Sequence, residues 1–396
     1  MPKKTIWRSL SKKTTQKIDG MMAENGRPST SRLFPLDALR GLIIILMALD
    51  HANHFVAQQH SSGEYWGGAF PSYDNALPFL TRFVTHLAAP GFFFLMGAGM
   101  TLFTFSARRQ DWHRWAFLRH FWLRGLILIA LQLLIVNRAW ELSPSGWALD
   151  IYIGVLFALG ATMIVGSFLL WLPANWLLVV SVGLVLGTAV FFPDPAQWTQ
   201  PQTILARLLF IPGGDLSVWV NYPVIPWLGL VTFGMAFAHW LHDDTRQAYR
   251  RAWQLGLLFL LAFVSLRLLN DFGNLRPRDG DDWIAFLNVV KYPPSLTFIL
   301  LTMGINLSLL SAFSYIGSKG ERLLQPLLVY GRVPLFFYIT HLFLYAALGN
   351  LLTPDGTSLL VMYGYWLLGL LILYPLCLGY GRFKQSRPAN SIWRFF

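Results

Sequence analysis

Residues 36–55, LDALRGLIIILMALDHANHF, place several ionisable side chains in a run that is apolar enough to cross a bilayer. Arg40 and His51 are eleven positions apart, close to three helical turns, so we expect both on one face of a helix. Asp50 and His54 continue this stripe through i, i+3 and i+4 spacing. A neutral imidazole is a general base near pH 7. The stripe therefore has groups suited to proton transfer.

A second apolar segment, TRFVTHLAAPGFFFLMGAGM, repeats the pattern in milder form. Arg82 and His86 are four residues apart and therefore share a helix face. Because this helix would run antiparallel to the first one, we expect His86 at about the depth of His51. Pro90 and Gly91 should loosen the helix and leave carbonyl groups free to line a cavity.

A third segment, GRVPLFFYITHLFLYAALG, carries Arg332, Tyr338 and His341. Ionisable groups inside a membrane are costly and normally face a bundle interior or a water-filled cavity. We therefore expect the three polar helices to surround a watered cavity into which His51 projects. A lone histidine such as His341 is as commonly an interhelical hydrogen-bond partner as a functional group, whereas clustering favours function for the others.

The whole chain has the composition of a polytopic membrane protein. Charged residues make up 13% of it, against roughly 25% in soluble domains, and hydrophobic residues 55%. The mean hydropathy is +0.48. The net charge of +12 comes mostly from Lys and Arg in short segments between apolar runs. That distribution is typical of cytoplasmic loops on anionic lipid rather than of a nucleic-acid surface.

The apolar runs predict an all-α membrane bundle of about ten transmembrane helices over residues 33–383. The basic loops favour cytoplasmic positions for both termini. We expect a basic, mostly disordered cytoplasmic tail at 1–32 and a short basic cytoplasmic C-terminus at 384–396. The expected spans are 33–56, 77–105, 121–138, 147–170, 176–192, 221–241, 252–270, 292–315, 325–350 and 357–381.

The sequence lacks the usual motifs for several kinds of chemistry. DHANH has two histidines and an acid, but neither an HExxH nor a CxxC framework accompanies it, so we expect no metal. No Walker loop, GxGxxG element or GxSxG nucleophile occurs. General-base chemistry is therefore favoured over a stored covalent intermediate.

Six segments together resemble the catalytic domain of the heparan-alpha-glucosaminide N-acetyltransferase family, in register from about residue 32 to the C-terminus. The Arg40 to His51 spacing also resembles the wider transmembrane acyltransferase group, which includes the acyltransferase-3 family. The six segments are LDALRGLIIILMALDH, TRFVTHLAAPGFFFLMGAG, YPVIPWLG, KYPPSLTFILLTMG, GRVPLFFYITHLFLY and YPLCLGYGRFKQ.

The resemblance implies transfer of an acetyl or other acyl group from cytoplasmic acetyl-CoA to a hydroxyl or amine outside, on a glycan or small molecule. We assign His51 as the base, and Asp50 and His86 as its catalytic companions. Binding roles are assigned to Arg40 and Arg332 for acyl-CoA, and to His54, Arg82, Tyr338 and His341 for the substrate.

One departure from the family pattern concerns the base. The lysosomal members resemble this chain less closely here, with an asparagine matching His51 and the catalytic histidine in the segment that follows. His60 is the nearest counterpart of that downstream histidine. We favour His51, because both the stripe and the acyltransferase spacing indicate it.

The alternative function is a proton-coupled transporter or exporter, since buried His and Asp groups suit proton relays. No inverted repeat supports it, and substrate flux without an acyl donor would distinguish the two. The expected partners are the lipid bilayer, acyl-CoA, the acceptor and a second copy of the chain as a homodimer. We expect a multi-pass protein of the cell inner membrane and no binding to nucleic acid.

Overall fold

The computed structural model describes residues 34–60, 64–65, 67, 71–108, 112–192, 202–316, 318–388, 391 and 393. The predicted tail at 1–32 lies outside this part, as do residues 389–390, 392 and 394–396 of the predicted C-terminal segment 384–396. The helices are α2 (Phe34–Ala52), η2 (Asn53–Ala57), α3 (Ala76–Thr85), α4 (Ala88–Arg108), α5 (Arg114–Leu131), η3 (Gln132–Val136), α6 (Asn137–Glu141), α7 (Val155–Ser167), α8 (Ala174–Phe191), α9 (Ile204–Leu209), α10 (Val224–Asp243), α11 (Thr245–Leu269), α12 (Trp283–Leu287), α13 (Leu296–Ser314), α14 (Ser318–Leu323), α15 (Gln325–Arg332), α16 (Pro334–Leu352) and α17 (Leu359–Ser386). The strands are β1 (Ile151–Ile153), β2 (Gly213–Gly214) and β3 (Val218–Val220).

The prediction of an all-α polytopic membrane bundle is confirmed. Within the described residues, 8 helical segments are long and apolar enough to cross a membrane. Two predicted spans do not meet that criterion. Helix α2 carries Asp37, Arg40 and Asp50 within its 19 residues, and α7 has only 13 residues because β1 occupies the start of the predicted span 147–170. The count of ten spans and the positions of the termini stay predictions.

Two predicted spans are interrupted where proline excludes a regular helix. The span predicted at 77–105 divides into α3 and α4 at His86 and Leu87. Pro90 follows by one turn, and a proline ring clashes with the carbonyl group four residues before it. The span predicted at 325–350 divides at Val333, directly before Pro334, because the residue before proline avoids helical backbone angles. At each break, backbone N–H and C=O groups leave the regular hydrogen-bond pattern of the helix, close to the polar residues of that span.

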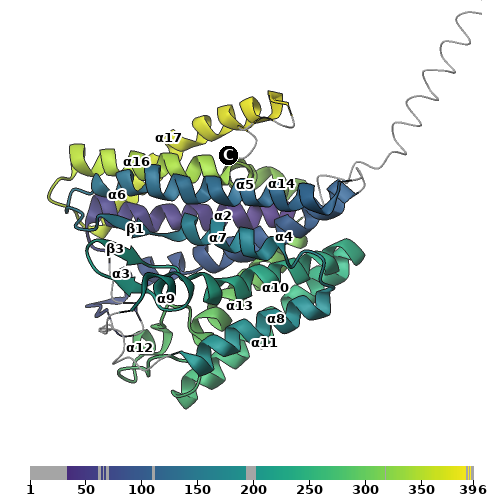
Figure 1. The fold of residues 1–396 in the computed structure, drawn as a ribbon. Helices are drawn as coiled ribbons and strands as arrows, with labels where there is room; N and C mark the ends of the chain where they lie inside the picture. Colours follow the sequence, from purple (N-terminus) through teal and green to yellow (C-terminus); the bar gives the residue numbers. More distant parts are fainter. Residues whose placement is uncertain are drawn as a thin grey trace, which may run out of the picture. The chain divides into compact units, whose positions relative to one another are not determined.

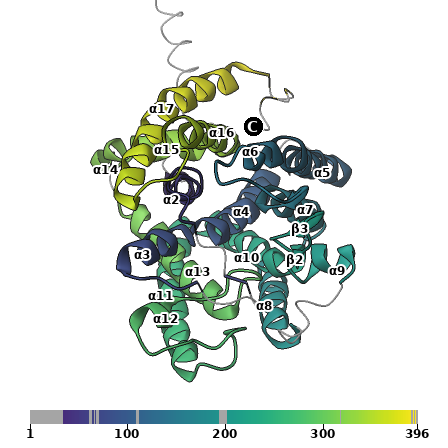
Figure 2. The ribbon, with the colours of Figure 1, turned by 90° about the vertical axis from the view of Figure 1, so that its left-hand side faces the viewer.

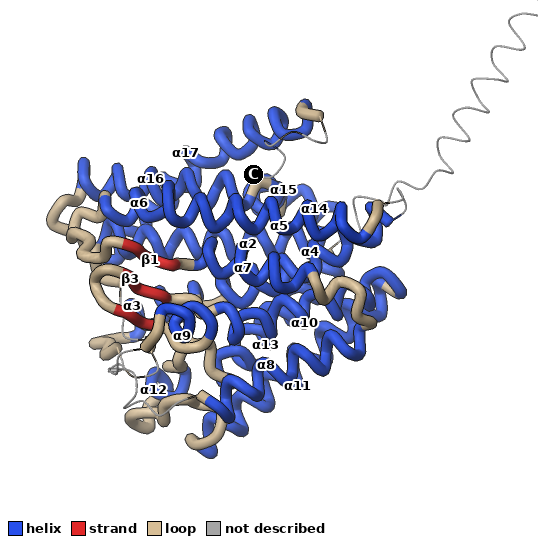
Figure 3. Tube along the Cα trace, viewed as in Figure 1, coloured by secondary structure: helices blue, strands red, loops and turns tan. Residues whose placement is uncertain are grey.

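The long helices lie side by side, with the small sheet at one end of the bundle (Figures 1 and 3). Helix α10 packs against α4, α7, α8 and α11. In the most apolar stretch of α10, 83% is buried, whereas the corresponding share for α8 is 11%. Helix α10 is therefore internal, and α8 offers most of its surface to lipid. Figure 2 looks along the bundle and shows α2 between α16 and α4.

The sheet connects loops at the end of the bundle that we predict to be extracytoplasmic. Its strand order is β1-β3-β2, with β1 parallel and β2 antiparallel to β3. A separate bridge joins Tyr65 to Tyr292. These pairings hold residues of four loops in place at the end of the membrane helices, where the polar site lies.

The backbones of α4 and α10 are in direct contact. We therefore expect a larger side chain at Gly97 to destabilise the fold. An added Cβ there would lie 1.9 Å from the carbonyl oxygen of Val231, and one at Gly234 would lie 1.9 Å from that of Phe94. Because a backbone cannot move aside cheaply, Gly97→Leu should lower the free energy of unfolding by about 3 kcal/mol. Thermal unfolding in detergent measures this change.

The matched control for this prediction is Gly183→Leu. A Cβ added at Gly183 meets no atom within 4 Å, and leucine favours helix over glycine by up to about 1 kcal/mol. The control should therefore unfold at the same temperature as the parent protein or slightly higher. Equal melting temperatures for both variants would contradict the close packing of α4 on α10.

Candidate functional site

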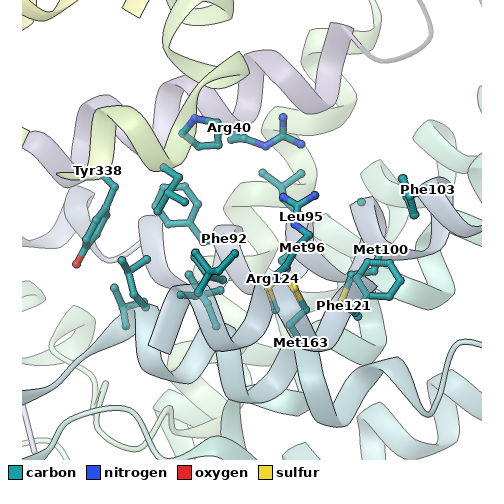
Figure 4. Close-up of a pocket in the computed structure, with 18 of the residues that line it drawn as sticks. Arg40, Phe92, Leu95, Met96, Met100, Phe103, Phe121, Arg124, Met163 and Tyr338 are labelled. Atoms are coloured by element: carbon teal, nitrogen blue, oxygen red, sulfur yellow. The ribbon is translucent and has the colours of Figure 1, made fainter. Parts of the chain in front are cut away.

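A cavity of about 430 Å³ lies between α2, α4, α5, α7 and α16. Its basic lining groups are Arg40, Arg124, Arg332 and Lys384, and most other lining side chains are apolar. Figure 4 shows Tyr338 at one extreme of the cavity and Phe103 at the other, with Arg40 and Arg124 between them. The cavity thus reaches from the end of the bundle that we predict to be cytoplasmic towards the middle of the helices.

A close crossing of α2 and α15 fixes Arg40 in this cavity. A Cβ added at Gly331 would lie 2.2 Å from the carbonyl oxygen of Asp37, so only glycine permits the approach. Arg40 donates to Asp37 Oδ1 at 2.8 Å and to the Gly331 carbonyl at 3.1 Å. Arg332 Nε lies 3.8 Å from the other Asp37 oxygen, with about half of its side chain exposed. One carboxylate therefore holds two arginines at the cavity.

A pair of histidines joins α2 to α16. His51 Nδ1 lies 2.6 Å from His341 Nε2, and the two rings stack with centroids 4.9 Å apart. His341 Nδ1 lies 2.9 Å from the carbonyl oxygen of Phe337, one turn earlier in α16. His341 is fully buried, while His51 is 9% exposed.

The hydrogen bonds of this pair determine where the protons of the neutral rings lie. The Phe337 carbonyl can only accept, so His341 Nδ1 carries the hydrogen and His341 Nε2 has a lone pair. His51 Nδ1 must then donate to His341. The remaining nitrogen, His51 Nε2, has the free lone pair that a general base requires.

The ring of Tyr338 separates this pair from the cavity. Tyr338 lines the cavity, and its ring meets that of His51 edge-on at 6.3 Å. Trp140 covers another side of His51 at 5.5 Å. His51 is not among the residues that line the cavity, so the structure differs here from the expectation that its ring projects into the opening. His51 thus lies behind the Tyr338 ring, next to the cavity but not in its lining.

A buried network of ion pairs lies on the other side of α2. Arg82 donates to Asp50 Oδ1 at 2.5 Å and to Glu64 Oε1 at 2.7 Å, and its second amino group pairs with Glu64 Oε2. His86 Nε2 lies 2.7 Å from Glu64 Oε1, and Thr85 donates to Asp50 at 2.9 Å. The structure thus brings together Asp50, Arg82 and His86, which the sequence singled out separately.

Glu64 enters this network from the loop between η2 and α3. It is 1% exposed, and its carbonyl oxygen accepts from the backbone N–H groups of Lys291 and Tyr292 at 3.2 Å. Burial alone would raise the pKa of Glu64, but Arg82 and His86 outweigh that effect and hold the pKa well below its usual value. Glu64 is therefore ionised at neutral pH. The sequence analysis did not identify it, because a single acid in a short loop has no periodicity to mark it.

Two further histidines, His54 and His60, lie near the sheet end of α2. His60 Nε2 is 3.4 Å from Asp50 Oδ1, so the imidazole beside Asp50 is that of His60 and not that of His51. His54 Nε2 lies 3.2 Å from the Ser143 hydroxyl, with the Trp140 ring 4.8 Å away. In the described part of the chain, no three His, Cys, Asp or Glu side chains are grouped as a metal site would require.

The sequence profile of the family described as "Heparan-alpha-glucosaminide N-acetyltransferase, catalytic" matches residues 32–269, more than half of the chain. The chain belongs to this family. The predicted resemblance is thereby confirmed, although the segment that carries Tyr338 and His341 lies beyond the matched residues.

Two curated relatives carry the same name. The heparan-alpha-glucosaminide N-acetyltransferase of Mus musculus is 31% identical over 153 residues, which are 38% of this chain and 21% of the relative. That of Homo sapiens is 30% identical over 138 residues, which are 35% of this chain and 19% of the relative. The matched stretch thus spans about a fifth of the length of these relatives.

The ion network predicts an acid-sensitive contribution of Glu64 to stability. Removing one partner of a buried ion pair costs about 3–5 kcal/mol, so Glu64→Gln should lower the free energy of unfolding by that amount at pH 7. The folded pKa of Glu64 is depressed, so its contribution is present above the unfolded pKa of about 4.3 and is lost as pH falls through the folded value. The gap between parent and variant should therefore close below about pH 4 in thermal unfolding.

Glu141→Gln provides the matched control. Its partner is Arg138 in an exposed ion pair at 2.6 Å, and such pairs contribute at most about 1 kcal/mol. A Glu64→Gln variant as stable as this control at pH 7 would show that the network does not stabilise the fold.

Proposed function

We propose that this protein is a membrane-bound acetyltransferase. It would move an acetyl group from cytoplasmic acetyl-CoA to an amine or hydroxyl of an extracytoplasmic glycan, in the cell inner membrane. The family membership supports the reaction class. One observation carries the proposal. The cavity with basic lining groups reaches the ring of Tyr338, and the His51–His341 pair lies directly behind that ring.

The donor fits the cavity by charge and by shape. Arg40, Arg124, Arg332 and Lys384 supply four positive charges, and guanidinium groups bind phosphate in a bidentate manner. The apolar part of the lining would hold the pantetheine arm and direct the thioester towards Tyr338. Asp37 keeps Arg40 and Arg332 oriented before the donor arrives.

His51 is the base that the hydrogen bonds favour. Its Nε2 lone pair takes the proton from the acceptor nitrogen or oxygen, which attacks the carbonyl carbon of the thioester. The carbon–sulfur bond then breaks and CoA leaves as the thiolate, which takes up a proton. His341 orients the base and stabilises the imidazolium, as a carboxylate does in other enzymes. For the thioester to reach His51, the Tyr338 ring must turn aside.

His60 is the second candidate base, since Asp50 lies 3.4 Å from it and would stabilise its imidazolium. Asp50 is itself held by Arg82 and Thr85, which fixes its position. The acceptor is proposed to enter from this side, next to the aromatic cluster of His54, Trp140 and Trp147.

The first prediction of this function concerns His51. Since a general base contributes about 10²- to 10⁴-fold, His51→Ala should reduce transfer of radiolabelled acetyl from acetyl-CoA to D-glucosamine by that factor. The purified protein in proteoliposomes is the sample, and scintillation counting of acetylated sugar is the readout. His60→Ala should cause a smaller loss.

His113→Ala is the matched control, because His113 is exposed at the start of α5 and forms no side-chain cap. It should keep the parent rate. Unchanged transfer in folded His51→Ala would remove His51 from the mechanism, and a larger loss in His60→Ala would make His60 the base.

The second prediction concerns the donor cavity. Gly99 lines it, and an added Cβ there meets nothing within 4 Å. Gly99→Leu should therefore fill the cavity without distorting the helix and weaken acetyl-CoA binding by at least about tenfold, or about 1.4 kcal/mol. Isothermal titration with acetyl-CoA measures the change.

Gly364→Leu is the control, because Gly364 is also open to space but is not among the cavity residues. It should bind acetyl-CoA with the parent affinity. Parent affinity in the Gly99 variant would place the donor elsewhere.

A further inference from the structure

The hydroxyl group of Tyr338 forms no hydrogen bond with any described residue, although the side chain is only 7% exposed. Tyr338 lies in α16, three residues before His341, and it lines the cavity. A buried tyrosine hydroxyl usually has a hydrogen-bond partner. This hydroxyl is not one of the fully enclosed polar atoms that lack a partner, so it opens onto accessible space. It is therefore available to a ligand in the cavity.

The neighbouring tyrosine hydroxyls are already engaged within the protein. Tyr222 and Tyr152 lie within electrostatic range of Tyr338. The hydroxyl of Tyr222 is hydrogen-bonded to that of Tyr292 at 3.1 Å, and the hydroxyl of Tyr152 accepts from Asn221 at 3.0 Å. Of the three hydroxyls, that of Tyr338 is thus the one whose hydrogen-bonding capacity is unused.

Tyr338 differs from the other polar residues of the described lining, which are all cations: Arg40, Arg124, Arg332 and Lys384. The proposed function assigns these cations to the phosphates of the donor. Figure 4 shows the hydroxyl oxygen of Tyr338 at one extreme of the cavity, apart from Arg40 and Arg124. A thioester that arrives at this extreme therefore meets a neutral hydrogen-bond donor rather than a charge.

The N-terminus of α7 lies at the same end of the cavity. Val155 and Leu156 are the first two residues of α7, and both line the cavity. Tyr152, which lies near Tyr338, directly precedes this helix. The N–H group of Val155 donates to no acceptor in the described part of the chain. Because the N-terminus of a helix carries partial positive charge, negative charge is favoured beside it.

We propose that the Tyr338 hydroxyl binds the carbonyl oxygen of the thioester and stabilises the oxyanion that forms during acyl transfer. This assignment makes Tyr338 a catalytic residue, and it rests on the proposed function. Acyl transfer places a negative charge on that oxygen, and a fixed hydrogen-bond donor lowers the energy of the charged state more than that of the neutral ester. The positive end of α7 acts in the same direction.

The hydroxyl donates a hydrogen bond and keeps its proton throughout the reaction. The acceptor nitrogen or oxygen forms a bond to the carbonyl carbon while His51 takes its proton, and the π electron pair of the carbonyl group moves onto the oxygen. Collapse of this intermediate restores the C=O double bond and breaks the carbon–sulfur bond. The CoA thiolate leaves and receives the proton that His51 took.

One side chain thus both covers His51 and holds the ester. The Tyr338 ring meets the ring of His51 edge-on at 6.3 Å. When the ring turns aside, the hydroxyl moves with it, so an ester bound to the hydroxyl is carried along. The two roles can be separated by substitution, because phenylalanine keeps the ring and lacks only the hydroxyl.

The first measurement is the steady-state kinetics of Tyr338→Phe in proteoliposomes, with acetyl-CoA as donor and D-glucosamine as acceptor. Loss of one oxyanion donor costs about 10²- to 10³-fold in kcat, so kcat should fall by that factor. The KM for acetyl-CoA should stay near the parent value, because the lost interaction acts mainly in the transition state.

The second measurement does not depend on turnover. It is the infrared spectrum of bound acetyl-CoA labelled with carbon-13 at the ester carbonyl. A hydrogen bond to the oxygen weakens the C=O bond, so the carbonyl band should lie at lower frequency in the parent than in Tyr338→Phe. CoA without the acetyl group should bind both proteins with equal affinity in isothermal titration, which also shows that the variant is folded.

Tyr330→Phe is the matched control, because it removes a buried hydroxyl that is not part of the cavity. Tyr330 donates to the carbonyl oxygen of Leu370 at 2.7 Å and is not among the lining residues. This variant should keep the kcat of the parent and the same carbonyl band.

A lower kcat together with a higher carbonyl frequency in Tyr338→Phe supports the proposal. Parent kcat in this variant would overturn it and leave the ring as a barrier alone. An unchanged carbonyl band would also overturn it, since the ester oxygen would then lie elsewhere. A parent protein that transfers no acetyl group would overturn the proposed function, and the infrared comparison would still decide whether the hydroxyl contacts the bound ester.

Discussion

The arrangement of this protein depends on one interaction, the pairing of Arg82 with two carboxylates from different parts of the chain. A charge inside a membrane protein is tolerated only where opposite charges and hydrogen bonds replace water. Asp50 from α2 and Glu64 from the following loop meet Arg82 from α3 and so connect three segments. This contact sets the position of α2 and, with it, of His51, the residue that follows Asp50. It also draws a loop that we predict to be extracytoplasmic into the bundle, where that loop meets Lys291.

The polar residues form two sites that α2 separates along its length. Near the end that we predict to be cytoplasmic, Asp37 orients Arg40 and Arg332 at an open cavity. Near the sheet end, the histidines and the ion network lie among aromatic rings. A donor with phosphates suits the first site, and a polar acceptor suits the second. The His51–His341 pair lies between them, so that in the proposed reaction it could act on both substrates.

The sequence predicted the features that depend on local spacing. The stripe on α2, the polar character of α3 and α16, and the weakening at Pro90 follow from helical periodicity and from the lack of a proline N–H. Features that depend on tertiary contacts could not be predicted. The partner of His51 is 290 residues away. Glu64 comes from a loop without periodicity, and the strand β1 inside an apolar run forms because β3 pairs with it. Asp50 was expected beside His51, yet neighbouring residues on a helix point in different directions.

The position of the Tyr338 ring, between the cavity and the histidine pair, has a consequence for the energetics of the cell. A continuous column of water between the cavity and the outer histidines would let protons follow the electrical potential, which contributes about 2.3 kcal/mol per charge for each 100 mV. The Tyr338 ring lines the cavity and meets the ring of His51. In the proposed reaction, that ring would interrupt such a column and would shield the bound thioester from water. It would thus let titratable groups lie along most of the route without discharging the membrane.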